Sequence, residues 1–69
     1  MKAFGKETII TKRAALDIIE SVFGAGMEKT IDDDLFSSIV DGMVKDGLYE
    51  ISEKEKQQLR ALAAEIRNN

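Results

Sequence analysis

Residues 32–51 read DDDLFSSIVDGMVKDGLYEI, and this stretch decides the fold of the chain. At about 100° per residue, the apolar side chains between Leu35 and Val44 fall on one side of a helix, within an arc of about 180°. This periodicity predicts an amphipathic helix at about 32–46. Residues 43–51 also fit a competing structure, a β-hairpin around a type I′ Asp-Gly turn. We favour the helix because its apolar residues keep the helical phase throughout.

Two further segments show helical periodicity. Residues 12–23 carry a wide apolar arc and follow Thr11, a favourable N-cap. Residues 53–67 follow Ser52 in a capping-box sequence, Ser-Glu-Lys-Glu, and carry a narrower apolar stripe. A chain of 69 residues is long enough for one small core. We therefore expect a mainly α fold with three helices, in a single small helical domain that spans residues 1–69.

Two short segments outside these helices contain β-branched or aromatic residues. Residues 8–10 and 48–51 each lead directly into a Thr or Ser helix cap. They are the candidates for a short two-stranded β ribbon. Such a ribbon is only marginally stable alone, but packing against the helices would stabilise it and would tie the N-terminus to the middle of the chain.

The composition argues against catalysis. The chain has no Cys and no His, so it lacks a thiolate nucleophile, Cys ligands for zinc and the commonest general base. The carboxylates that could serve acid–base catalysis fall on polar helix faces or beside turn glycines, where exposure makes a carboxylate a poor general acid: Asp17, Glu20, Asp41, Asp46 and Glu50. We expect a protein that is not an enzyme and that has no catalytic residues, no metal site and no cofactor.

An acidic cluster surrounds the start of the predicted helix 32–46. A calcium loop of the EF-hand type does not fit it, because counting from Asp32 puts Phe36 at the fifth position, where that loop needs an oxygen ligand. Acids at a helix N-terminus are stabilised by the helix dipole, so the cluster can be explained by helix stability alone. If the cluster also has a function, it would contact a basic protein partner.

No stretch of the sequence reaches the roughly 18 apolar residues that a membrane span requires. The N-terminal segment has basic residues but no continuous apolar run behind them, so it does not resemble a secretory signal. We therefore expect a cytoplasmic protein without a membrane partner.

Charge and apolar surface together indicate binding. The formal net charge is −3, but residues 1–13 are basic and residues 14–50 strongly acidic. The two wide apolar arcs exceed the roughly 100° stripe that a helix needs against its neighbours. We therefore expect a non-enzymatic protein-interaction module, a small adaptor, subunit or inhibitor that docks an apolar helical face with an acidic rim onto another protein, or onto a second copy in a homodimer. The candidate contacts are Glu28, Asp32, Asp33, Asp34, Phe36, Val40, Met43 and Tyr49.

Nucleic acid is the alternative partner. Residues 14–51 form a helix, a loop, an amphipathic helix and then Lys-Asp-Gly-Leu-Tyr-Glu-Ile, which resembles the way winged helix-turn-helix proteins leave their recognition helix and enter the wing. The resemblance implies a small DNA-associated transcriptional regulator whose residues 32–46 enter the major groove. The acids of that segment have the wrong sign for phosphate contacts, so basic residues elsewhere would supply them. These candidates are Lys12, Arg13, Lys56, Arg60 and Arg67.

Overall fold

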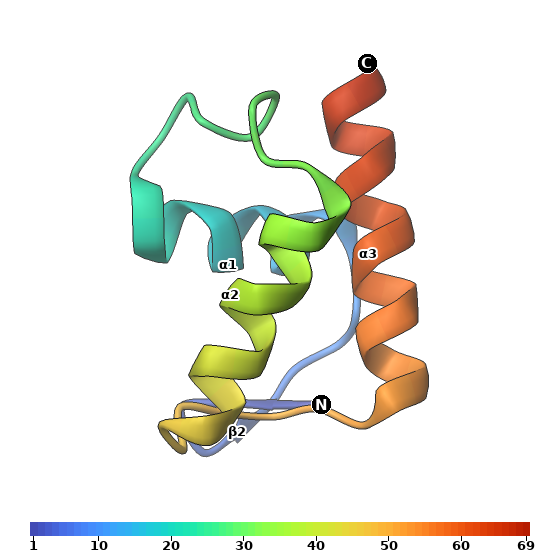
Figure 1. The fold of residues 1–69 in the computed structure, drawn as a ribbon. Helices are drawn as coiled ribbons and strands as arrows, with labels where there is room; N and C mark the ends of the chain where they lie inside the picture. Colours follow the sequence, from blue (N-terminus) through green and yellow to red (C-terminus); the bar gives the residue numbers. More distant parts are fainter.

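The computed structural model describes all 69 residues and contains three helices with one small antiparallel sheet (Figure 1). The mainly α fold that the sequence predicts is confirmed. The elements in chain order are β1 (Lys2–Ala3), β2 (Lys6–Glu7), α1 (Lys12–Phe23), α2 (Asp33–Lys45), β3 (Tyr49–Glu50) and α3 (Glu53–Asn68). No helix has the length and apolar character needed to cross a membrane.

Each helix begins at a side-chain cap that the sequence contains. The Thr11 hydroxyl accepts a hydrogen bond from the backbone N–H of Ala14, and the Asp32 carboxylate accepts one from Leu35. At α3 the capping box is complete, because Ser52 accepts from the Glu55 N–H and the Glu55 side chain accepts from the Ser52 N–H. These bonds satisfy backbone donors that the first turn of a helix leaves unpaired.

The choice between a helix and a hairpin for residues 43–51 is settled in favour of the helix. α2 continues to Lys45, and Gly47 then adopts a positive φ of 80° that glycine tolerates without strain. The Leu48 N–H donates to the Met43 carbonyl oxygen at 3.0 Å, which closes the end of the helix. The Asp-Gly dipeptide therefore ends a helix here and does not join two strands.

The predicted β ribbon is half wrong. Its C-terminal strand exists as β3, but the strand that pairs with β3 is β1, at residues 2–3, and not residues 8–10. The sheet has the order β2-β1-β3, and both pairs are antiparallel. Phe4 and Gly5 both have positive φ, 53° and 80°, the combination that a type I′ hairpin turn requires. This turn folds the first seven residues into a hairpin, so that β1 occupies the place beside β3.

The three helices enclose the core. In Figure 1, α2 and α3 run antiparallel and α1 crosses behind them. Twelve residues are buried, and all of them are apolar or aromatic. The largest fully buried side chains come from all three helices: Phe36, Ile18, Ile19, Leu59 and Val40. Tyr49 joins the sheet to this core, since the residue as a whole, backbone included, is 4% exposed.

Candidate interaction surface

The four apolar residues predicted to contact a partner lie in the core. Phe36, Val40 and Met43 point from α2 toward the other helices, and Tyr49 covers the sheet end of the same cluster. Their exposed fractions lie between 0% and 8%. The prediction that these side chains form a docking face is therefore wrong. The centre of the apolar arc of α2 faces α1 and α3 and not solvent.

The four predicted acids have different surroundings. Asp33 forms an ion pair with Arg67 of α3, with 3.1 Å between Oδ1 and Nη1. Asp32 caps α2, while Asp34 is exposed and Glu28 is half-buried. None of these last three forms an ion pair, and one carboxylate oxygen of Glu28 is shielded from solvent without any hydrogen-bond partner. Glu28, Asp32 and Asp34 are therefore three acids without a cationic partner, at the N-terminus of α2 and in the loop before it.

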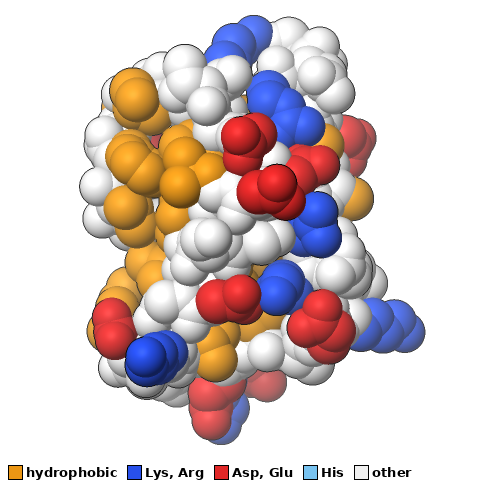
Figure 2. All heavy atoms as spheres, viewed as in Figure 1, with side chains coloured by type: hydrophobic (Ala, Val, Ile, Leu, Met, Phe, Trp, Pro, Cys, Tyr) orange, Lys and Arg blue, Asp and Glu red, His pale blue; other side chains and the backbone are white.

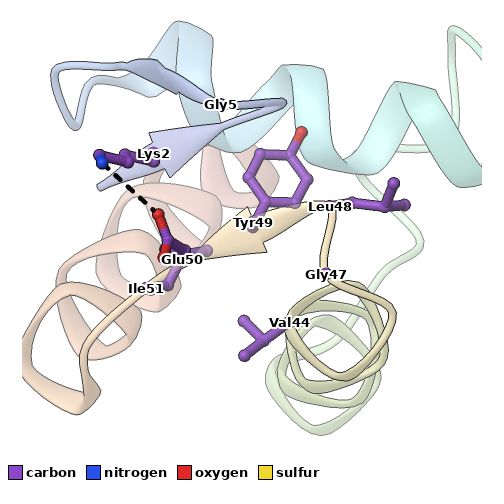
Figure 3. Close-up of a pocket in the computed structure, with 8 residues that line it drawn as sticks. All are labelled: Lys2, Gly5, Val44, Gly47, Leu48, Tyr49, Glu50 and Ile51. Atoms are coloured by element: carbon purple, nitrogen blue, oxygen red, sulfur yellow. Dashed lines mark ion pairs between the residues drawn. The ribbon is translucent and has the colours of Figure 1, made fainter.

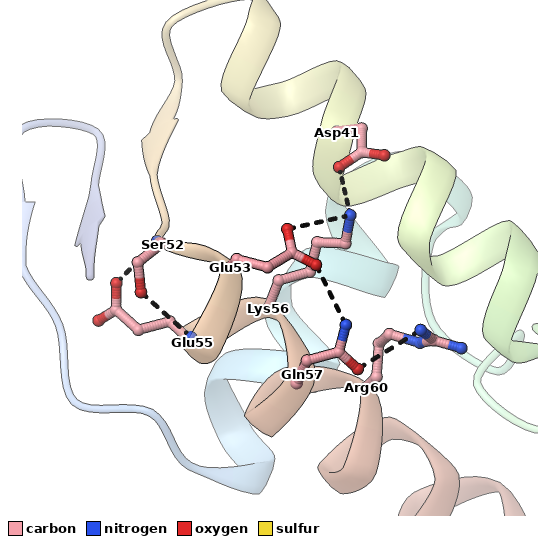
Figure 4. Close-up of polar contacts among 7 residues, drawn as sticks. All are labelled: Asp41, Ser52, Glu53, Glu55, Lys56, Gln57 and Arg60. Atoms are coloured by element: carbon pink, nitrogen blue, oxygen red, sulfur yellow. Dashed lines mark hydrogen bonds and ion pairs between the residues drawn. The ribbon is translucent and has the colours of Figure 1, made fainter.

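Of the three basic residues of α3 predicted to contact nucleic acid, Lys56 and Arg67 are paired with acids within the protein (Lys56 in Figure 4). Lys56 Nζ lies 2.9 Å from Asp41 of α2 and 3.9 Å from Glu53. The hydrogen bond to Asp41 raises the pKa of Lys56 above its ordinary value, despite some desolvation. Arg60 is half-buried and donates to a neighbouring glutamine, and Arg67 is held by Asp33. Lys56 and Arg67 therefore join α3 to α2.

The basic residues at the start of α1 are paired as well. Lys12 lies 3.8 Å from Glu65 of α3. Arg13 lies 3.0 Å from Asp17 and 3.6 Å from Glu20, one and two turns further along the same helix. Both cations remain exposed, so these pairs contribute little to stability, but they reduce the positive field that the sequence alone suggests.

Large apolar side chains are exposed at the end of α1, in the loop that follows it and in the first turn of α2. Val22 and Phe23 end α1, Met27 lies in the connecting loop and Leu35 lies in the first turn of α2, and each is between 39% and 49% exposed. Figure 2 shows hydrophobic side chains gathered in a band on this side of the molecule, with acidic side chains over the start of α2 beside it. We call these four residues, together with Glu28, Asp32 and Asp34, the α1–α2 surface.

The loop within this surface turns before Met27 and is fixed to α3 after it. Gly24 and Gly26 take positive φ values of 80° and 93°, which turn the chain away from α1. Ile31 is buried in the core, and its carbonyl oxygen accepts a hydrogen bond from Arg67 at 3.1 Å. The α1–α2 surface is therefore held by contacts to α3, although α3 contributes none of its residues.

The sequence contains a signal for this surface. Val22, Phe23 and Leu35 belong to the wide apolar arcs, and arcs wider than a neighbour can cover indicate exposed apolar area. Periodicity does not tell which part of an arc is covered by the other helices, so it cannot separate the buried centre of the arc from its exposed edge. Met27 lies outside any helix and has no periodic signal.

Nowhere in the structure do three carboxylates converge closely enough to hold a metal ion.

The chain was also compared with protein-family models, with curated proteins and with solved structures, and no match was found.

Proposed function

We propose that this protein is a non-enzymatic interaction module that binds a basic, amphipathic segment of another protein at its α1–α2 surface. The observation that carries the proposal is the combination found there: four large exposed apolar side chains beside three acids that form no ion pair. Exposed apolar area supplies the affinity of most protein contacts, and unpaired charge at the rim selects the sign of the partner.

A basic partner suits this surface better than a second copy of the chain. In a two-fold symmetric dimer the same patch faces itself, so the acidic rim of one copy would approach the acidic rim of the other. Like charges at an interface oppose association, whereas Lys or Arg side chains on a partner would neutralise Glu28, Asp32 and Asp34.

Nucleic acid is the less favoured partner. Phosphate binding requires cations that are free to release counterions, and Lys56, Arg67 and Arg13 each have an acid within 3.1 Å. The segment that resembles a recognition helix, α2, presents unpaired acids at its N-terminus, the end at which such helices contact bases.

A pair of synthetic peptides tests the proposal. One is a helical peptide of about 14 residues with Leu on one face and Lys on the other, long enough for about four turns. The second has the same Leu spacing with Glu in place of Lys. We expect the Lys peptide to bind at least tenfold more tightly than the Glu peptide, about 1.4 kcal/mol or more, in isothermal titration at moderate salt.

Two variants locate the binding. Leu35→Gln removes an apolar side chain from the surface without adding an acid that would itself attract Lys, and it should weaken binding of the Lys peptide at least tenfold, about 1.4 kcal/mol. Ile9→Gln is the matched control, because Ile9 is 82% exposed and lies outside the surface. Equal affinity for both peptides, or retention on a DNA column with no peptide binding, would contradict the proposal.

A further inference from the structure

The last turn of α3 contacts the loop that carries part of the α1–α2 surface. Arg67 Nη1 donates to two acceptors, the Ile31 carbonyl oxygen and Asp33 Oδ1, each at 3.1 Å. The Arg67 side chain is 25% exposed, and it lies 36 and 34 residues away from these acceptors along the chain. One side chain therefore joins α3 both to the end of the loop and to the first turn of α2.

The loop segment before Ile31 is a turn with hydrogen bonds of its own. The backbone N–H and the hydroxyl of Thr30 both donate to the Met27 carbonyl oxygen, at 3.0 and 2.8 Å. Met27 and Glu28, two residues of the α1–α2 surface, belong to this turn. Ile31 follows it and is 3% exposed. The turn therefore ends at the residue that Arg67 contacts.

A second polar contact reaches the same turn from the end of α3. Lys29 donates to the Asn69 carbonyl oxygen, but both residues are exposed, so water competes for this bond. Arg67 is half-buried, and the carbonyl oxygen that it contacts belongs to a buried residue, Ile31. Arg67 is therefore the better shielded of the two polar contacts between the turn and α3.

We propose that Arg67 is a positioning residue for the α1–α2 surface: it holds the turn so that Met27 and Glu28 are already in place when a basic segment binds. This role rests on the proposed function of that surface. A ligand that must order a loop as it binds loses affinity to the entropy of ordering, whereas a loop held beforehand avoids this loss. Binding should therefore weaken when Arg67 is removed, although the loss of a cation would by charge alone strengthen the binding of a basic ligand.

The test uses a background in which the ion pair is already absent. Asp33→Asn keeps the bond from Arg67 to Ile31, and adding Arg67→Met removes that bond without leaving an acid unpaired. In isothermal titration we expect the Lys peptide to bind the double variant about threefold more weakly than Asp33→Asn. Circular dichroism spectra confirm that the variants are folded.

Arg60→Met in the same Asp33→Asn background is the matched control. It also removes a cation from α3, but Arg60 donates to Gln57 and contacts neither acceptor of Arg67. This change should not weaken binding of the Lys peptide.

Exchange of the Thr30 amide measures the turn without a ligand. By NMR, this amide should exchange about threefold faster when Arg67→Met is added to Asp33→Asn, because the turn opens more often. Arg60→Met should leave the exchange unchanged. If Arg67 only stabilised the fold, its removal would lower the free energy of unfolding and leave the affinity of the folded protein as it was.

The outcomes separate this role from the proposed function. If the Lys peptide does not bind the original protein, the proposed function is wrong and the role of Arg67 falls with it. If the peptide does bind the original protein, equal or tighter binding to the double variant, or an unchanged Thr30 amide, would overturn the role of Arg67 and leave the proposed function standing.

Discussion

At the scale of single residues, the capping box at the start of α3 is the most specific local structure in the protein. Ser52 and Glu55 exchange two hydrogen bonds, of 2.9 and 3.2 Å, between side chain and backbone. Ser52→Ala should lower the free energy of unfolding by about 1 kcal/mol, because it leaves a first-turn donor without its acceptor. Urea unfolding measures the loss. Ser38→Ala, an exposed change within α2, is the control and should have little effect.

Glu55 also makes stability depend on pH. A hydrogen bond from the N-terminal ammonium of Met1, 2.5 Å away, and a second from the Ser52 backbone lower the pKa of Glu55 from 4.5 to about 2. Because the pKa is depressed in the folded state, the stabilisation is present above the unfolded pKa and is lost as the pH falls from about 4.5 to about 2.

Glu55→Gln isolates this effect, since Gln can keep the capping-box hydrogen bond while losing the charge. The difference in urea midpoint between the original protein and Glu55→Gln should be largest near neutral pH and should shrink across the acidic range. A difference that stays constant down to about pH 2 would mean that the Glu55 carboxylate is not stabilised in the folded state.

At the scale of elements, α2 divides its apolar arc between the core and solvent. Val40 is 1% exposed and Val44, one turn later, is 38% exposed. Val40→Ala should therefore cost about 2 kcal/mol of unfolding free energy, from lost burial and a residual cavity. Val44→Ala should change it by less than about 0.5 kcal/mol. Thermal or urea unfolding of the matched pair checks this, and equal losses would mean that the arc is not divided as described.

The seam between α2 and α3 is a second property of the elements. Arg67 contacts both Asp33 and the Ile31 carbonyl oxygen, and its side chain is 25% exposed. A double-mutant cycle of Asp33→Asn and Arg67→Met should give a coupling energy of about 0.5–1 kcal/mol, the size typical of partly exposed pairs. A coupling energy of zero would mean that Arg67 stabilises this seam only through its hydrogen bond to the Ile31 carbonyl oxygen.

The sequence predicts where the helices of this protein lie better than it predicts which residues they contact. Caps and apolar phase are local properties, and they locate α1, α2 and α3 to within a residue or two. The strand beside β3 is missed because the hairpin turn depends on Phe4, a bulky residue with a positive φ of 53° that no composition rule anticipates. The buried side of α2 and the pairing of Lys56 with Asp41 depend on where α3 packs, which only tertiary structure determines.

At the scale of the whole molecule, large apolar side chains are exposed at both ends of α2, Leu35 in its first turn and Val44 in its last. The α1–α2 surface combines apolar side chains with acids that form no ion pair, whereas the hollow at β3 is lined by apolar side chains and by the Lys2–Glu50 ion pair (Figure 3). Three of the ten cations, Lys12, Lys56 and Arg67, pair with an acid of another helix, and Lys2 pairs with Glu50 within the sheet.

An NMR titration of the ¹⁵N-labelled protein with the Leu/Lys helical peptide tests whether a basic protein segment binds at the α1–α2 surface. We expect chemical-shift changes concentrated at Val22, Phe23, Met27, Glu28 and Leu35, and we expect them to weaken as salt screens the acidic rim. Changes spread over the whole protein, or centred on Lys12 and Arg13, would contradict binding at this surface.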